Sequence, residues 1–89
     1  MSKECVPYRA GTADVDSSGV KVELSGTIRQ ILVYPTVDAQ ISLNDSSTDS
    51  VFLPSGMWTP VSVSIDYNVR NFTVTSNESG KVHWQGWVI

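Results

Sequence analysis

The chain has 89 residues, with nine acidic and six basic side chains, one histidine and one cysteine. The net charge of −3 and the isoelectric point near 4.7 disfavour nucleic acid as a partner, because phosphate backbones favour a basic stripe and these bases do not cluster. Cys5 has no second cysteine to pair with, and no Cys or His pair has zinc-ligand spacing. The sequence therefore predicts one small domain without a metal or cofactor.

The apolar runs are short. None approaches the roughly 20 residues that span a bilayer, so no membrane partner is expected. Residues 1–11 also lack the apolar core of a signal peptide, and we expect synthesis in the cytoplasm. A domain of this size buries only about 60 to 65% of its unfolded surface. Assembly with other subunits is therefore the expected source of extra stability.

Residues 1–19 contain scattered charges and turn residues, with Val6, Tyr8 and Val15 as the side chains to bury. They are predicted to form an extended N-terminal arm without regular structure of its own. Tyr8 and Val6 favour docking of this arm on the domain's own sheet or on a neighbour's. Deletion of residues 1–15 is then expected to weaken assembly more than folding.

From Val20 onward apolar and polar residues alternate, which is the two-residue period of a strand with one wet face. The pattern recurs in seven runs: 20–24, 28–34, 39–43, 51–53, 61–67, 70–75 and 81–89. Turn residues separate these runs, and no stretch has helical period. The sequence therefore predicts an all-β fold: a single antiparallel β-sandwich, jelly-roll-like, of about seven strands over residues 20–89, preceded by the arm 1–19.

The sequence also predicts which residues of one strand share a face, and the type of one connection. In the run 28–34, Ile28 is predicted to share one face with Leu32 and Tyr34, opposite Ile31 and Val33. Such a strand is central or is covered by something besides its own core. Residues 76–80 have the length and the terminal glycine of a hairpin loop.

Few side chains could carry chemistry. His83 is the one imidazole, and we interpret it as a structural or surface histidine because it lies in a strand beside Trp84 and Trp87. The loop 44–50 offers oxygen ligands for calcium, but without a recognised calcium-loop spacing. Glycosidase chemistry would need paired carboxylates, and the candidates are Asp38, Asp45, Asp49 and Asp66. All four lie in predicted turns or on the polar face of a predicted strand, so exposure to solvent accounts for their presence. The sequence predicts no enzyme and no metal site.

Aromatic residues are abundant for so small a domain. Trp84 and Trp87 point to opposite faces of a regular strand, so one belongs to the core and the other faces outward. An outward tryptophan is covered by the arm, forms a protein interface or stacks on a sugar ring. Ile89 on the same face favours the protein interface. The candidate interface residues are Tyr8, Tyr34, Trp58, Trp87 and Ile89.

Three segments carry a resemblance to a known class of proteins. They are the run 51–58 (VFLPSGMW), the strand 72–75 (FTVT) and the closing 82–87 (VHWQGW). With the alternating Val/Ser strand between them, the chain from about residue 20 to 89 resembles the small β-rich virion proteins of tailed bacteriophages. Capsid decoration (cement) proteins and minor head or tail proteins belong to this class.

The resemblance implies a non-enzymatic structural protein, made in the bacterial host cytoplasm and assembled into the virion. Its partners would be copies of itself and the major capsid or tail protein. Homo-oligomers are expected; such families often form trimers, and no feature of the sequence fixes the copy number. The alternative is a carbohydrate-binding or host-recognition module of a phage tail, in which outward aromatics stack on sugar rings.

Overall fold

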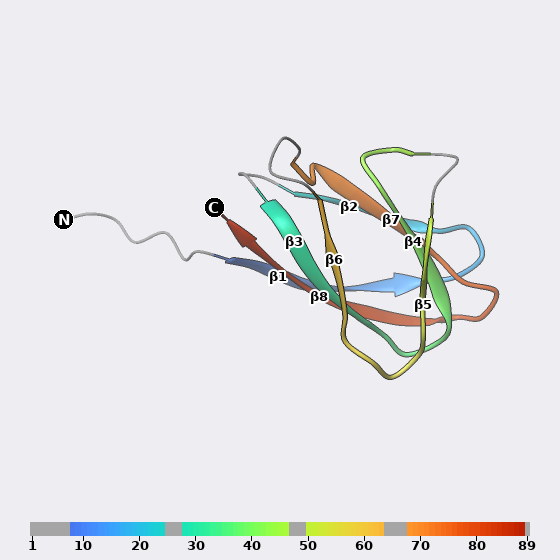
Figure 1. The fold of residues 1–89 in the computed structure, drawn as a ribbon. Helices are drawn as coiled ribbons and strands as arrows, with labels where there is room; N and C mark the ends of the chain where they lie inside the picture. The colour runs from blue at the N-terminus through green and yellow to red at the C-terminus, as the bar shows by residue number, and fades with distance from the viewer. Residues whose placement is uncertain (1–7, 25–27, 47–49, 64–67, 89) are drawn as a thin grey trace.

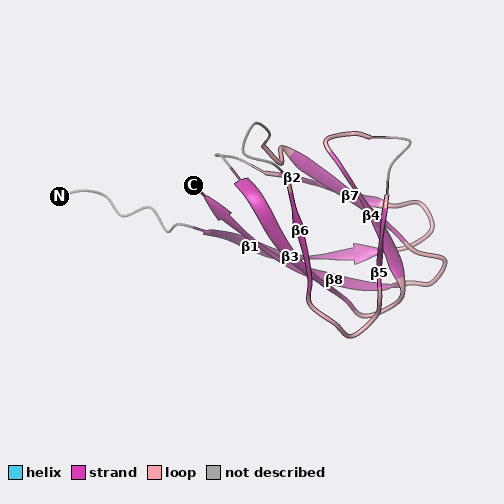
Figure 2. Cartoon of the chain, in the orientation of Figure 1, coloured by secondary structure: helices cyan, strands magenta, loops and turns pink. Residues whose placement is uncertain are grey.

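The computed structural model describes residues 8–24, 28–46, 50–63 and 68–88. These residues form eight β-strands and no helix (Figure 1, Figure 2). The strands are β1 (Tyr8–Val15), β2 (Val20–Glu23), β3 (Ile28–Pro35), β4 (Ala39–Leu43), β5 (Val51–Leu53), β6 (Thr59–Ser62), β7 (Asn71–Thr75) and β8 (Gly80–Val88).

The strands make two antiparallel four-stranded sheets that face each other as a β-sandwich (Figure 1). Sheet A has the order β1-β8-β3-β6, and sheet B has the order β2-β7-β4-β5. Most connections cross from one sheet to the other, whereas β4 and β5 are joined within sheet B. The all-β sandwich expected from the alternating sequence is confirmed.

The core fills the space between the sheets. Successive side chains of a strand point to opposite faces, so every second residue enters this space and is removed from water. Phe72 of sheet B and Trp84 of sheet A meet edge to face there, with ring centroids 5.6 Å apart. The buried apolar residues are Val15, Ile28, Ile31, Val33, Ala39, Ile41, Leu53, Val61, Val69, Phe72, Val74 and Val82.

Strand β1 lies in the segment for which the sequence predicted no regular structure, and that prediction is wrong for Tyr8–Val15. All eight residues pair with β8, and Val15 enters the core. The described part of the chain therefore holds eight strands where seven were predicted. Residues 1–7, the first part of the predicted arm, lie outside the described residues.

Strand β1 was not recognised in the sequence because several of its inward residues are small. Its inward positions include Gly11 and Ala13, which carry no strong apolar signal. Gly11 leaves room for the Trp84 ring, because an added Cβ would lie 3.0 Å from that ring. The Trp84 side chain of β8 thus fills the space that a larger residue of β1 would otherwise occupy. Strand β1 therefore forms because of tertiary packing and not because of local strand propensity.

The face assigned to Ile28 also needs correction. The pairing of β3 with β8 shifts register between Ile28 and Ile31, as at a β-bulge. The extra residue turns Ile28 inward with Ile31 and Val33, while Leu32 and Tyr34 stay on the outer face and are half-buried. Gly86 of β8 lies against this bend, where an added Cβ would meet Ile31 at 3.0 Å.

The predicted hairpin at residues 76–80 is instead a crossing between sheets, because β7 belongs to sheet B and β8 to sheet A. Loop length and a terminal glycine do not distinguish these two connections. The predicted strand 61–67 begins earlier, at Thr59, and β6 includes Pro60, which an edge strand tolerates. The remainder of that prediction, residues 64–67, lies outside the described residues.

Candidate functional site

The outer face of sheet A brings several of the predicted interface residues together. Strand pairing places Thr12, His83 and Tyr34 side by side on β1, β8 and β3. The next row toward the other end of the sheet is Ala10, Gln85, Leu32 and Pro60. Residues in such rows point to the same face, so they form one continuous surface.

Trp58 completes the first row from the connection between β5 and β6. Its ring centroid lies 5.3 Å from that of Tyr34, at an interplanar angle of 53°. The rings of Tyr34 and His83 lie 6.0 Å apart at 52°. We call Tyr34, Trp58 and His83 the aromatic cluster. It leaves 46% of Trp58 exposed.

Trp87 lies on the same face toward the other end of β8 and is 41% exposed. Its backbone pairs with that of Tyr8, so both residues occupy one row. Leu32 and Pro60 stand between this row and the aromatic cluster. Three candidates, Tyr34, Trp58 and Trp87, therefore share one face; the Tyr8 side chain and Ile89 lie outside the described residues.

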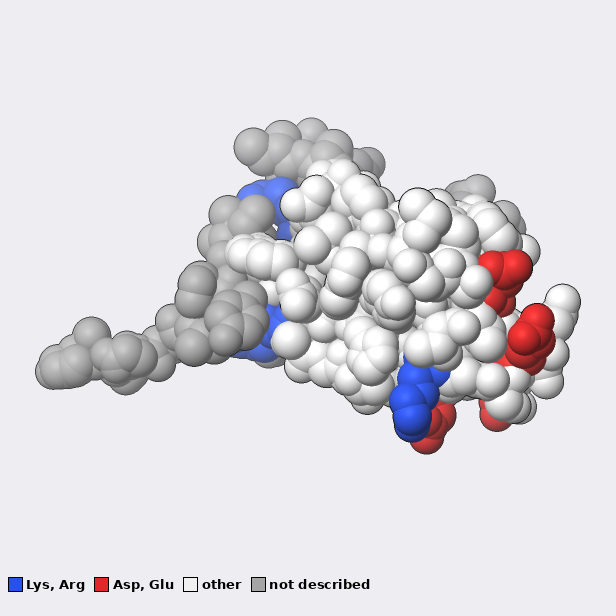
Figure 3. Space-filling view, turned by 90° about the horizontal axis from the view of Figure 1, so that it is seen from below, with Lys and Arg blue, Asp and Glu red and all other residues white. Residues whose placement is uncertain are grey.

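This face is nearly uncharged. Among the outward positions that the strand pairing fixes on this face, the charged residues are Asp14 and Lys81, which face each other across β1 and β8. Arg29 lies within the register shift of β3, so the pairing does not assign it to either face. Lys81 Nζ lies 2.6 Å from Asp14 Oδ1, so the two charges compensate. Figure 3 views the molecule from below, the side along which β1 and β8 run in Figure 1. Charged atoms there lie toward the margins of the described surface.

His83 lacks the surroundings of a catalytic base in the described structure. Its Nδ1 forms a 3.0 Å hydrogen bond with the hydroxyl of Thr12, and its ring packs near Tyr34. Among the described residues no carboxylate orients the imidazole, so the third member of a nucleophile, base and acid arrangement is missing from them. The contacts are those of a histidine that fixes β1 and Tyr34 in place.

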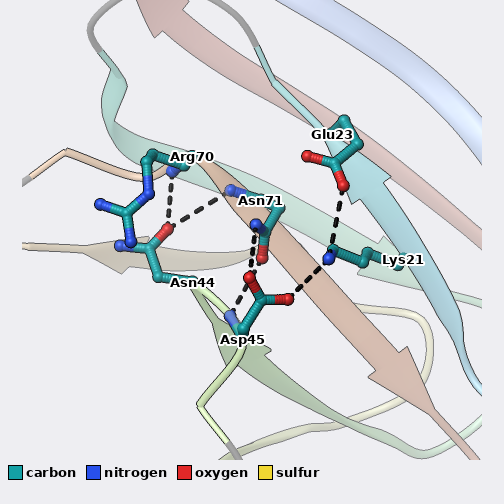
Figure 4. A network of polar contacts seen from close by, with 6 residues as sticks. All are labelled: Lys21, Glu23, Asn44, Asp45, Arg70 and Asn71. Carbon is teal, nitrogen blue, oxygen red and sulfur yellow. Dashed lines mark hydrogen bonds and ion pairs between the residues drawn. The ribbon is translucent and has the colours of Figure 1, made fainter.

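A polar network fixes the start of the loop that had offered oxygen ligands for calcium (Figure 4). Asn44 has a left-handed backbone, with φ of 51°. Its Oδ1 accepts the backbone N–H of Arg70 at 2.6 Å and that of Asn71 at 3.3 Å. Its Nδ2 donates to the backbone carbonyl of Asn68 at 2.9 Å. Both ends of the Asn44 amide are therefore used by the fold.

Asp45, next in the chain, is held by Lys21 of β2. Lys21 Nζ lies 2.6 Å from Asp45 Oδ1, and Asn71 Nδ2 donates to Oδ2 at 3.3 Å (Figure 4). The hydrogen bond from Lys21, with a second from Asn71, lowers the pKa of the Asp45 carboxyl. The same contact with Asp45 raises the pKa of Lys21. The Lys21 ammonium thus occupies the position beside the Asp45 carboxylate that a metal ion would take.

The described residues contain no group of three or more His, Cys, Asp or Glu side chains placed to hold a metal ion. Residues 47–49, which include two of the candidate calcium ligands, lie outside the described part of the chain. The network around Asn44 and Asp45 joins the turn after β4 to β7 and β2.

Several residues of the outer face were missed by reasoning from the sequence. Leu32 and Pro60 belong to it, as does the Thr12 hydroxyl, and Met57 beside Trp58 is also exposed. The alternation in residues 28–34 had placed Leu32 on the same face as Tyr34, but Leu32 was not chosen as an interface residue. Thr12 could not be placed, because its strand had not been recognised.

Comparisons with known proteins add no family to this geometry: no family model, no curated protein and no solved structure matches the chain. A helix of sufficient length and apolarity to cross a membrane is likewise not found within the described residues. The arguments for function therefore depend on the two sheets and on their outer faces.

Proposed function

We propose that this protein is a non-enzymatic structural protein that binds other protein subunits through the outer face of sheet A. The observation that carries the proposal is the nearly neutral face between the aromatic cluster and Trp87. Aromatic residues are enriched at the buried centres of protein interfaces, and charged residues are depleted there. Exposed apolar surface of this kind is costly unless a partner covers it.

The pairing of the strands supports a jelly roll as the finer description of the fold. Strand β1 pairs with β8, β2 with β7, β3 with β6 and β4 with β5. These are the pairings of one long two-stranded ribbon wound into a sandwich. Eight-stranded jelly rolls are the fold of many viral capsid domains, and also of lectins.

A place in a phage particle follows as the finer part of the proposal. The protein would be a capsid decoration or cement protein, synthesised in the bacterial host cytoplasm and bound to itself and to the major capsid or tail protein. A small domain gains stability when neighbouring subunits bury its apolar face. Genes for capsid, portal or tail proteins beside its own gene would support this assignment, and a neighbourhood of metabolic genes would contradict it.

The alternative, in which the same aromatics stack on sugar rings, is less well supported on this face. The Tyr34 and Trp58 rings are tilted by 53° against each other and do not form a flat platform. The neighbouring row contributes Ala10, Leu32 and Pro60, with Gln85 as its one polar side chain. This face therefore suits an apolar protein surface better than a saccharide.

Self-association measured by sedimentation equilibrium tests the proposal. We expect oligomers of the isolated protein at tens of micromolar, and Trp58→Ala should raise the dissociation constant by at least about tenfold, as loss of a central interface aromatic does. Phe52→Ala is the matched control, because Phe52 is similarly exposed, at 58% against 46% for Trp58, but belongs to sheet B. A strictly monomeric wild type, or equal weakening by both changes, contradicts the proposal.

A further inference from the structure

A cavity of about 540 Å³ lies at the end of the sandwich where the β1–β2, β3–β4 and β7–β8 connections meet the outer face of sheet B. Its volume falls within the range of small-molecule sites, roughly 300 to 1,000 Å³. The argument below uses six of its lining residues: Asp38, Gln40, Phe52, Ser76, Asn77 and Glu78. The aromatic cluster and Trp87 belong to the other sheet.

The floor of the cavity is a row of side chains across three strands. Gln40 of β4 pairs with Thr75 of β7 on one side and with Phe52 of β5 on the other. Phe52 is 58% exposed, the highest value among the large apolar residues that the structure describes. The Phe52 ring is thus exposed to solvent in the same row as the Gln40 amide and the Thr75 hydroxyl.

Polar groups around this ring are available to a ligand. The side chains of Gln40, Asn77 and Glu78 make no hydrogen bond or ion pair with other described residues. Asp38 Oδ1 accepts the backbone N–H of Ser55 at 2.9 Å, and its Oδ2 has no partner among the described residues. Amide donors and carboxylate acceptors therefore both face the cavity unused.

The walls of the cavity are held by the fold. Ser76 is buried; its hydroxyl donates to the backbone carbonyl of Asp38 at 2.6 Å and accepts the backbone N–H of Glu78 at 3.1 Å. The Ser76 backbone N–H donates to the carbonyl of Asp16 in the β1–β2 turn at 3.2 Å. These bonds join the three connections, so the site is formed before a ligand arrives, which lowers the entropic cost of binding.

We propose that this cavity binds a neutral sugar ring, with the apolar C–H face of the pyranose on Phe52 and its hydroxyls on Asp38, Gln40, Asn77 and Glu78. A hydroxyl both donates and accepts, so it uses carboxylates and amide N–H groups together. Two carboxylates repel an anionic ligand, and an ammonium ion would leave the amide donors unused. The inference goes beyond the protein-binding proposal, because it concerns the opposite sheet.

Ligand-observed saturation-transfer NMR with the full chain tests this site. The probes are the methyl glycosides of glucose, galactose, mannose and N-acetylglucosamine. We expect saturable transfer to at least one of them at millimolar concentration, strongest at the ring protons that contact Phe52. Phe52→Ala should weaken binding by at least about tenfold, and Asn77→Ala should weaken it severalfold.

Trp58→Ala is the control, because Trp58 is an exposed aromatic on the other sheet; it should leave sugar binding within about twofold of the wild type. Lack of transfer to all four glycosides overturns the inference. So does loss of binding in Trp58→Ala but not in Phe52→Ala, or competition by methylammonium at equal concentration. The sedimentation experiment reverses the roles of these two variants, so failure of one proposal is distinguishable from failure of the other.

Discussion

At the scale of single residues, two neighbouring positions determine how the loop after β4 begins. Asn44 and Asp45 both have positive φ, at 51° and 61°, a region that Asn and Asp tolerate better than most residues. Their side chains then hydrogen-bond to β7 and to Lys21 of β2. A polar stretch that is typical of a surface loop, or of a cation site, serves here to join three strands of sheet B.

The Asp45 contact predicts a dependence of stability on pH. Its pKa is lower in the folded state than its ordinary value of 3.8, because Lys21 and Asn71 bind the carboxylate. The contribution to stability is therefore complete above that value and is lost as pH falls through the lower folded pKa. Thermal unfolding of the wild type and of Asp45→Asn, measured from pH 6 to pH 2, should converge at the acid end.

Asp14→Asn is a control for this measurement, because Asp14 also pairs with a lysine but lies within β1 and pairs directly across to Lys81 of β8. Both ion pairs are exposed to solvent, so the convergence should be small in absolute size. A difference between wild type and Asp45→Asn that persists unchanged at pH 2 would contradict the role assigned to the ionised carboxylate.

At the scale of elements, the strands that could be predicted are those whose alternation is expressed by large side chains. Val20–Glu23, Ala39–Leu43 and Asn71–Thr75 form where apolar residues alternate with polar ones. Strand β1 could not be predicted, because the apolar side chain that fills the core at Gly11 is Trp84 of the partner strand β8. The inward turn of Ile28 depends on a register shift against β8, which no local pattern encodes.

The same distinction applies to the outer face of sheet A. Tyr34, Trp58 and Trp87 could be selected from the sequence because exposed aromatics are rare enough to stand out. That these residues share one face could not be predicted, because it follows from the order of β1, β8, β3 and β6 in the sheet. Phe52 was not selected at all, since its strand of three residues has no clear alternation.

Strand β1 changes what deletion of residues 1–15 is expected to do. The segment pairs with β8 along its length and places Val15 in the core, so its removal should cost folding itself and not mainly assembly. We expect the urea midpoint to fall by an amount equivalent to several kcal/mol, of the order found when a buried aliphatic side chain and its packing are lost. Circular dichroism during urea unfolding measures this.

Thr12→Ala serves as the matched change within β1, because Thr12 points outward and its removal leaves the ladder and Val15 in place. It should lower stability by about 1 kcal/mol or less, through the lost contact with His83. Unchanged stability after deletion of residues 1–15, with loss of assembly alone, would restore the view of this segment as an independent arm.

At the scale of the whole molecule, the two sheets present different outer surfaces. Sheet A carries aromatics with little net charge, whereas sheet B carries polar side chains, the Lys21 and Asp45 pair and the cavity beside Phe52. Both surfaces depend on the same core, since Phe72 and Trp84 join the layers. The surface proposed to bind protein and the cavity proposed to bind a sugar thus lie on opposite sheets and share no residues.

The near-neutrality of sheet A predicts how self-association responds to salt. Contacts between exposed charges weaken as salt shortens the Debye length, whereas burial of apolar surface does not, and sulfate strengthens it. The dissociation constant from sedimentation equilibrium should therefore change by less than about twofold between roughly 0.05 and 0.5 M sodium chloride, and should fall in sodium sulfate. Lys81→Ala, which removes the charge pair on this face, should leave that profile unchanged. A tenfold or greater weakening in sodium chloride would mean that charges hold the copies together, because apolar contacts between aromatic faces have no reason to respond to a screening salt.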